Sequence, residues 1–257
     1  HEENSNEPKL IDLGCKYRSG QTGTANEITG SVSGLNDGSI LIDVLNYRGN
    51  TLPSTGGMGT IAPNPYYTDE IAKTCMETIF LPTMHAMNAE GRTFKGCLYF
   101  GLMLTENGPK VIEYNCRFGD PETQVVLPLL ESDLLTVMEA TTNGTLDKTD
   151  VKFSDGAAAC VILASGGYPL AYEKGKEITG LDNGQLNAAD VTVYHAGTAV
   201  KEGRLVTNGG RVLGVTSVCD TLAEAVSCSY EKLGRISFEN AYYRHDIGKK
   251  ALECAEV

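Results

Sequence analysis

The sequence predicts an α+β protein, in which antiparallel hairpins and separate helices are followed by a strand-rich region. Two apolar runs, 97–104 and 110–115, flank Glu106-Asn107-Gly108, a turn typical of β-hairpins. Helical patterns with capping residues stand before and after that hairpin. From about residue 157 onward, short strands outnumber helices.

The first part of the chain contains one more hairpin signal and one long helix. Residues 1–24 are polar and remain unassigned. Residues 28–46 are predicted to form a strand, a turn at Asn36-Asp37-Gly38 and a return strand. A helix is expected over 68–90, with Thr68 as its N-cap and a kink or division at Pro82.

After the central hairpin the sequence predicts two helices and then a boundary. Asp120-Pro121 has the composition of a helix start, with Asp as N-cap and Pro at the first helical position. A second helix is expected over 132–142, ending at Asn143-Gly144. The polar stretch 145–155 is the expected boundary between a domain over 25–150 and another over 151–257.

The C-terminal region is expected to be a small strand-rich domain. Strands are predicted at 157–164 and 191–194, and 205–206 is expected to pair with 212–215 through Asn208-Gly209-Gly210. Thr221 and Glu224 form a capping box that should open one helix.

Composition excludes several classes of partner. The 257-residue chain has a net charge of -12, which disfavours nucleic acid and anionic membranes as partners. No apolar run is long enough to span a bilayer, so a cytoplasmic protein is expected. The eight cysteines form no C-x-x-C pair, so zinc or a disulfide framework is not predicted.

The most informative segment is 111–122, Val-Ile-Glu-Tyr-Asn-Cys-Arg-Phe-Gly-Asp-Pro-Glu. Side chains alternate along a strand, so Glu113, Asn115 and Arg117 are expected on one face, with Cys116 in the core behind them. Such a face suits a divalent cation, a phosphate or a carboxylate. The alternative is a solvated edge strand, but the turn and the acids that follow favour a functional surface.

Two acids after the strand allow two interpretations. Asp120 and Glu122 could stabilise a helix start through capping and the helix dipole, or could contact a substrate. A dual role is the favoured interpretation.

A glycine-rich loop offers a second candidate site. Thr55, Gly56, Gly57, Met58 and Gly59 could present backbone N–H groups to a phosphate or carboxylate. His195 could be a base, although a structural histidine at a strand end is the simpler interpretation. The Ser165–Pro169 turn and the 208–212 hairpin are interpreted as structural turns.

Taken together, five motifs resemble the phosphoribosylamine–glycine ligase (glycinamide ribonucleotide synthetase) family of the ATP-grasp superfamily. They are Thr-Gly-Gly-Met-Gly, the 111–124 segment, Ser-Gly-Gly-Tyr-Pro, His-Ala-Gly-Thr and Thr-Asn-Gly-Gly-Arg-Val-Leu. The resemblance implies the C-terminal half of an ATP-grasp domain followed by the family's C-terminal domain. It also implies purine biosynthesis: ATP phosphorylates glycine, and 5-phosphoribosylamine then displaces phosphate to form an amide.

The resemblance also assigns roles to residues. Glu113 and Asn115 match the family's magnesium or manganese ligands, and their hard oxygens suit a cation bound to nucleotide phosphates. Arg117, with Asp120 and Glu122, is placed at the reacting groups, where a cationic fork can hold developing negative charge. The 55–59 loop would hold phosphate or substrate.

The chain also departs from the family. An N-terminal nucleotide-like domain and the lysine-bearing lid over ATP are expected in the family and are not recognised here. The missing half is therefore an expected partner, and the isolated chain is expected to be inactive and to bind ATP weakly. A non-catalytic remnant or partner-binding isoform, and another ATP-grasp ligase or carboxylase, stay as alternatives.

Overall fold

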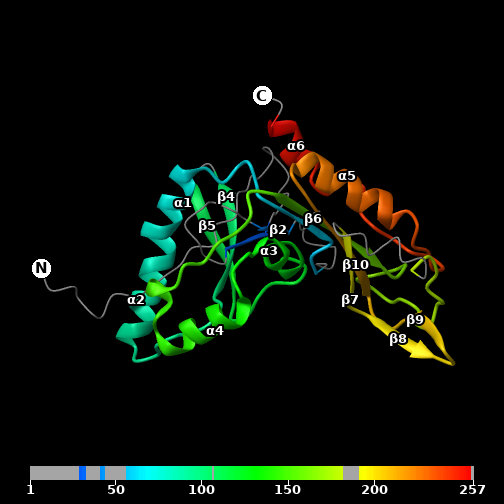
Figure 1. Ribbon diagram of the computed structural model, residues 1–257, viewed down its shortest axis with the longest axis horizontal. Helices are drawn as coiled ribbons and strands as arrows, with labels where there is room; N and C mark the ends of the chain where they lie inside the picture. The colour runs from blue at the N-terminus through cyan, green and yellow to red at the C-terminus, as the bar shows by residue number, and fades with distance from the viewer. Residues whose placement is uncertain (1–28, 33–40, 44–55, 106, 182–190, 256–257) are drawn as a thin grey trace, which may run out of the picture.

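The computed structural model describes residues 29–32, 41–43, 56–105, 107–181 and 191–255. Within these ranges the strands form two four-stranded sheets, ordered β2-β1-β4-β5 and β3-β6-β10-β7, and a separate β8-β9 pair. Figure 1 shows the first sheet beside α1 and α2, and the second beneath α5. The mixture of helices and antiparallel strands confirms the predicted α+β class.

The first sheet contains both predicted hairpins. β1 (Thr29–Val32) pairs antiparallel with β2 (Leu41–Asp43) and with β4 (Tyr99–Thr105). β4 pairs with β5 (Gly108–Asn115), so the central hairpin is confirmed. The pairing shifts where Gly101 faces Glu113 and Leu102 faces Val111, which places a β-bulge at Ile112. The turn expected at 36–38 lies outside the described residues.

The helix expected over 68–90 is present, with a change of period in its middle. It consists of α1 (Asp69–Cys75), a π-helical turn η2 (Met76–Phe80) and α2 (Leu81–Ala89). Thr68 caps it, since its hydroxyl accepts the Ile71 N–H at 3.4 Å. The π turn ends at Phe80, two residues before Pro82, which has no N–H to continue the helical bonds. The ring of Phe80 packs on Phe100 of β4, with 4.6 Å between centroids.

The two helices after the hairpin are present, but one begins later than predicted. α4 (Leu134–Asn143) is capped by Asp133 and ends at Gly144, whose φ of 72° is left-handed. α3 (Thr123–Leu129) has Glu122 at its N-cap without a side-chain cap bond. The prediction that Asp120 caps this helix is therefore wrong. The Asp120 carboxylate is instead bonded to Arg211 and Gln124.

The second sheet has a fully buried strand at its centre. β6 (Ala157–Ala164) lies between β3 (Gly59–Ala62) and β10 (Arg211–Cys219), and β7 (Val191–His195) completes the sheet. Every residue of β6 is buried, because α3 and α5 (Leu222–Leu233) both pack against it. β3 comes from residues before the boundary expected at 145–155, yet it pairs with β6 from residues after it.

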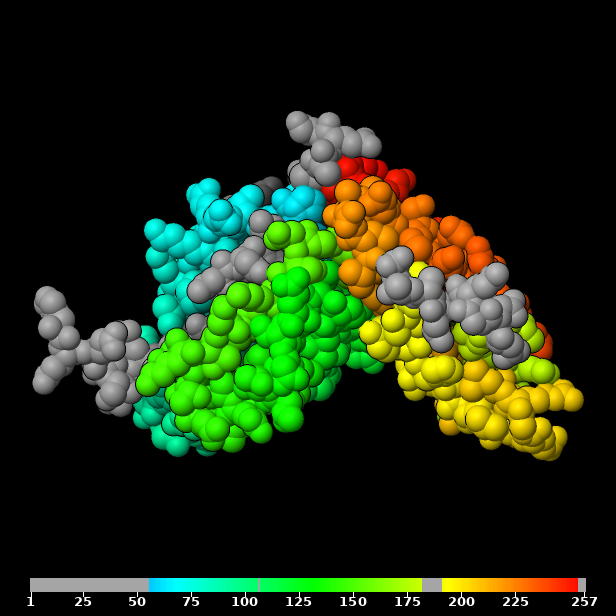
Figure 2. Space-filling model, in the orientation of Figure 1, coloured from blue at the N-terminus to red at the C-terminus, as the bar shows by residue number. Residues whose placement is uncertain are grey.

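The pairing expected across Asn208-Gly209-Gly210 is wrong. β9 (Arg204–Thr207) pairs with β8 (Thr198–Lys201) through a turn at Glu202 and Gly203, whose φ values of 51° and 76° suit a two-residue hairpin. β10 pairs with β6 and β7 instead. The Asn208–Gly210 segment thus connects two sheets. Figure 2 shows an open notch between the α4 region and the projecting β8-β9 hairpin.

The capping box is confirmed and a further C-terminal helix is found. Thr221 and Glu224 exchange side-chain and backbone bonds at the start of α5. α6 (Lys249–Ala255) follows, although the sequence analysis did not predict it. In the described part of the chain, no helix has the length and apolar character needed to cross a membrane.

Candidate active site

The end of β5 carries the candidate metal ligands. The Asn115 amide Nδ2 donates to Glu113 Oε1 at 3.1 Å, so the two side chains meet on one side of the strand. Glu113 is exposed and Asn115 is half-buried. Two oxygen-bearing side chains next to each other, open to solvent, fit a hard cation that keeps several waters. Among the described residues, no cluster of three or more His, Cys, Asp or Glu could hold a metal on its own.

Arg117 lies beyond the end of the strand rather than within it. β5 ends at Asn115, and Arg117 Nη1 donates to the carbonyl oxygen of Phe118 at 2.9 Å. The alternation that brings Glu113 and Asn115 together therefore stops before Arg117. Cys116 is exposed, so the prediction that it packs in the core is wrong for the same reason.

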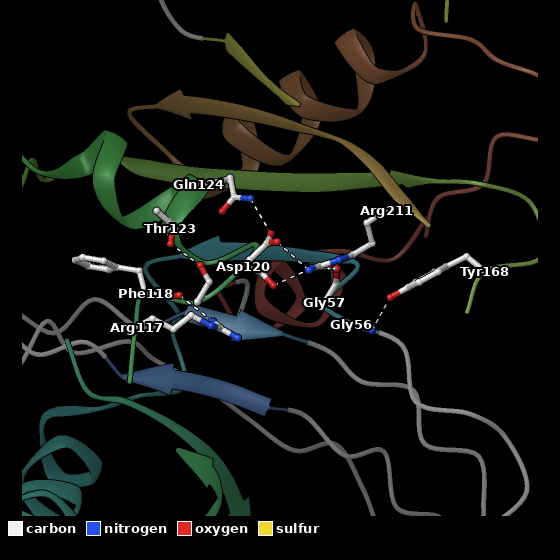
Figure 3. Close-up of polar contacts among 10 residues, drawn as sticks. Gly56, Gly57, Arg117, Phe118, Asp120, Thr123, Gln124, Tyr168 and Arg211 are labelled. Carbon is white, nitrogen blue, oxygen red and sulfur yellow. Dashed lines mark hydrogen bonds and ion pairs between the residues drawn. The ribbon is translucent and has the colours of Figure 1, made fainter. Parts of the chain in front are cut away.

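The turn after Arg117 is held by Asp120 and Thr123. Asp120 Oδ2 accepts from Arg211 Nη2 at 2.8 Å, and Oδ1 accepts from Gln124 Nε2 at 2.9 Å. The Thr123 hydroxyl and the Thr123 N–H both donate to the carbonyl oxygen of Gly119. Figure 3 shows Asp120 between Gln124 and Arg211. Both carboxylate oxygens of Asp120 are thus engaged by protein groups.

Glu122 is the most enclosed acid of this segment. It is 4% exposed, and its carboxylate lies against Gly119, where an added Cβ would come within 2.1 Å of Oε2. Gly119 is therefore required for this close approach. The buried position of Glu122 beneath the turn contrasts with the exposed position of Asp120.

The glycine-rich loop is divided between the site and the second sheet. Thr55 lies outside the described residues. Gly56 N–H donates to the Tyr168 hydroxyl at 2.9 Å, and the Gly57 carbonyl accepts from Arg211 Nη1 at 3.1 Å. Met58 is buried, and Gly59 begins β3, where an added Cβ would lie 2.6 Å from Ile247. Among the described residues of this loop, Gly56 is exposed and residues 57–59 are buried.

Two residues at the centre of the cluster were missed by the sequence analysis. Arg211 bonds to Gly57 O, to Asp120 Oδ2 and, at 2.7 Å, to the Asp120 carbonyl. Tyr168 bonds to Gly56 (Figure 3), and its ring lies against Gly210, where an added Cβ would come within 2.2 Å of it. Both belong to segments interpreted as structural turns. Their presence in two of the five family-like motifs was the signal that could have found them.

Two cysteines near the site are not reactive thiolates. Burial raises the pKa of Cys160 to about 12, although the Arg211 guanidinium acts in the opposite direction. Burial raises the pKa of Cys97 to about 12, and Arg117 opposes that shift. A thiol with such a pKa stays protonated at neutral pH. His195 lies at the end of β7 with Nδ1 3.1 Å from the Thr198 hydroxyl, which agrees with a structural histidine.

Two family models match the chain, one in the region that contains Asp120 and the other in the region that contains Arg211. Residues 45–123 match the phosphoribosylglycinamide synthetase ATP-grasp (A) domain, and residues 158–250 match the phosphoribosylglycinamide synthetase C domain. The chain belongs to the phosphoribosylglycinamide synthetase family. The five motifs noted above fall within the matched regions of this chain or directly next to them.

Relatives of this chain come from bacteria and animals. A phosphoribosylamine–glycine ligase of Caldanaerobacter subterraneus is 48% identical over 201 residues, which are 78% of this chain and 47% of the relative. The human trifunctional purine biosynthetic protein adenosine-3 is 46% identical over 80% of this chain and 20% of its own length. The chain thus spans about half the length of the single-function relatives it matches.

Solved structures with a similar fold confirm the fold of this chain. The crystal structure of phosphoribosylamine–glycine ligase from Thermotoga maritima matches with a TM-score of 0.68 and 34% identity, over 88% of this chain and 56% of the other. The biotin carboxylase domain of the Hydrogenobacter thermophilus 2-oxoglutarate carboxylase matches with a TM-score of 0.55 at 14% identity, over 84% of this chain and 46% of that one. The second match supports the ATP-grasp fold alone.

Proposed function

We propose that this chain is the C-terminal portion of a phosphoribosylamine–glycine ligase. ATP would transfer its terminal phosphate to a glycine carboxylate oxygen, giving glycyl phosphate and ADP. The amine of 5-phosphoribosylamine would then attack the carbonyl carbon and release phosphate, giving glycinamide ribonucleotide. The observation that carries this proposal is the meeting of the glycine loop, the 117–122 turn, Tyr168 and Arg211 in one cluster directly after Glu113 and Asn115.

Glu113 and Asn115 would hold the divalent cation, Mg²⁺ or Mn²⁺. Their adjacent oxygens on an open strand end fit a hard metal with few protein ligands. When bound, such a cation neutralises the charge on the nucleotide phosphates. Asn115 would rotate its amide so that the oxygen, rather than Nδ2, faces the cation.

The remaining candidate residues would position anions. Arg117 would hold the negative charge of the phosphate or the glycine carboxylate through its guanidinium fork. Asp120 and Glu122 would fix the turn that carries Arg117, and Thr55 would offer its backbone N–H to a phosphate or substrate. Gly56, whose N–H donates to the Tyr168 hydroxyl, would bring the loop backbone next to that ligand. The adjacent Gly57, Met58 and Gly59 would complete and anchor this loop. Bringing two anions together with their repulsion neutralised is the main task of such a site.

The complete active site would also require the part of the relatives that this chain does not match. That N-terminal half would supply the adenine contacts and the lid over ATP. Glycine, 5-phosphoribosylamine and ATP would then meet at the interface of the two halves. The purine pathway to which this reaction belongs would place the protein in the cytoplasm.

The proposal is tested by assaying product formation from ATP, glycine and 5-phosphoribosylamine. The chain would be assayed alone and together with the N-terminal half of the Thermotoga maritima relative. We expect glycinamide ribonucleotide only when both halves are present, and none when Glu113→Ala replaces the native chain. An inactive mixture of two halves that bind each other would instead identify the chain as a non-catalytic remnant.

A further inference from the structure

Arg211 connects two segments that are far apart in the sequence. It is the first residue of β10, where the pairing with β6 shifts between Arg211 and Leu213. From there the guanidinium crosses to the glycine loop and to the turn at Asp120 (Figure 3). The side chain is 21% exposed, so most of it is enclosed by these segments.

The geometry of these contacts requires a guanidinium. Nη1 donates to two carbonyl oxygens, Gly57 at 3.1 Å and Asp120 at 2.7 Å, and Nη2 donates to Asp120 Oδ2 at 2.8 Å. A planar group with five fixed donors can bridge three acceptors in this way, whereas a lysine ammonium is a single point charge. Two of the acceptors are backbone groups, so Arg211 fixes main-chain positions.

Tyr168 adds a second connection to the same loop. Its hydroxyl accepts the Gly56 N–H at 2.9 Å. An added Cβ at Gly56 would lie 3.1 Å from that hydroxyl and 3.2 Å from Arg211 Cζ, so the loop backbone lies directly against both side chains. The Tyr168 ring is itself placed by Gly210, where a Cβ would come within 2.2 Å of it. Residues 210–211 therefore control both connections.

We propose that Arg211 is a positioning residue of the ligase site, assisted by Tyr168. It holds the exposed end of the glycine loop in a fixed relation to the turn that carries Arg117 and Asp120. This role rests on the proposed ligase function, but the contacts that define it are testable without any turnover. Since a shift of about 1 Å in a catalytic group can lower turnover about 100-fold, a loosened loop should reduce the rate.

The first test measures hydrogen exchange of the loop in the 257-residue chain. Arg211→Ala and Tyr168→Phe are expected to speed exchange of the amides in residues 56–59 about tenfold, because each removes a bond that holds this segment. Arg204→Ala is the matched control: its partner Glu177 is at 3.0 Å, but Arg204 is 69% exposed and lies in the β8-β9 hairpin. Loop exchange in Arg211→Ala equal to that in Arg204→Ala overturns the proposal. Tyr168→Phe keeps the ring on Gly210, so it tests the loop even if Arg211→Ala does not fold.

The second test measures turnover with the N-terminal half supplied. Arg211→Ala is expected to lower kcat about 100-fold while the KM for ATP stays within about twofold. Guanidinium ion at non-denaturing concentration should raise the turnover of Arg211→Ala roughly tenfold, and ammonium ion should not. A merely structural residue would show neither the kcat-selective loss nor this rescue, and that result overturns the positioning role. A wild-type mixture that makes no product rejects the ligase function instead, and the exchange measurement still decides whether Arg211 holds the loop.

Discussion

Asp120 shows how one residue type can serve two purposes that its sequence context does not separate. An Asp before a Pro is an ordinary helix N-cap, and this motif led to the prediction of a cap. The structure instead directs both carboxylate oxygens to side chains, of which Arg211 is 91 residues away. The helix start could not reveal this contact, because a partner so distant in sequence is fixed only by the pairing of β10 with β6.

Glu113 is the residue whose removal should be most informative. Glu113→Ala is expected to abolish ligase turnover, because an oxygen ligand of the proposed cation is lost. The side chain is exposed, so the free energy of unfolding should change by less than about 0.5 kcal/mol. Turnover and urea unfolding of the variant check both statements, with the exposed Glu139→Ala as control. Near-normal turnover of Glu113→Ala would remove Glu113 from the site.

Gly210 should be intolerant of a methyl group. In Gly210→Ala the new Cβ would lie 2.2 Å from the Tyr168 ring, so the ring or the strand must move. We expect a loss of about 1–3 kcal/mol in the free energy of unfolding, measured with urea. Gly234→Ala is the control, since its Cβ would meet nothing closer than 3.5 Å at the end of α5. Equal stability of the two variants would contradict the close packing.

Asp246 should make stability depend on pH in the acid range. Hydrogen bonds of 2.8 and 2.6 Å from the buried Arg244 lower the pKa of Asp246, against the effect of burial. A lowered folded-state pKa gives stability that is present above the unfolded value, about 3.9, and is lost as pH falls through the folded value.

The variant Asp246→Asn should therefore be less stable than wild type at pH 7. Since Asp246 is half-exposed and water screens the pair, the expected loss is no more than about 1 kcal/mol. Its difference from wild type should shrink as the pH falls below about 4. Urea unfolding across pH 3–7 measures this, with the exposed Asp155→Asn as control. A difference that stays constant with pH would exclude the ion pair as its cause.

At the scale of elements, strongly periodic or capped segments were predictable and long-range pairings were not. The 97–115 hairpin, the 68–90 helix, α4 and the start of α5 were predicted because their turns and caps are local signals. The pairing of β9 failed because two turn signals, Glu202-Gly203 and Asn208–Gly210, compete and the second contains more glycine. The same holds for the candidate site. Glu113 and Asn115 are two residues apart and were predicted together, whereas Arg211 is 91 residues from its partner Asp120 and was not predicted.

The capping box of α5 offers a direct test of a local signal. Thr221→Ala removes the hydroxyl that accepts the Glu224 N–H at 3.3 Å. It should lower the free energy of unfolding by about 1 kcal/mol. The control is Thr78→Ala, whose exposed hydroxyl only bonds back to the Thr74 carbonyl and should matter by less than about 0.5 kcal/mol. Thermal unfolding measures the stability of both variants. An equal loss of stability in Thr221→Ala and Thr78→Ala would contradict the role of the cap.

At the scale of the whole molecule, nucleotide affinity should depend on residues beyond this chain. The chain covers 47% of the Caldanaerobacter relative, and the adenine contacts of the proposed ligase are assigned to the other half. Calorimetric titration of the 257-residue chain with ATP and Mg²⁺ should therefore show weak binding, in the millimolar range of about −4 kcal/mol. Addition of the N-terminal half should tighten it. Micromolar affinity of the chain alone would place the nucleotide contacts within it.

The position of β3 governs how this protein can be dissected. Gly59–Ala62 forms the outer strand next to β6, and it directly follows the loop proposed to hold phosphate. Expression of residues 151–257 alone would leave one edge of β6 without its neighbour, an apolar template for aggregation. A soluble C-terminal fragment must therefore keep Gly56–Ala62, or receive the same residues as a separate peptide that pairs with β6. A peptide of this kind would carry part of the loop as well as the strand, so variants of the proposed phosphate-binding loop could be exchanged by changing the peptide alone.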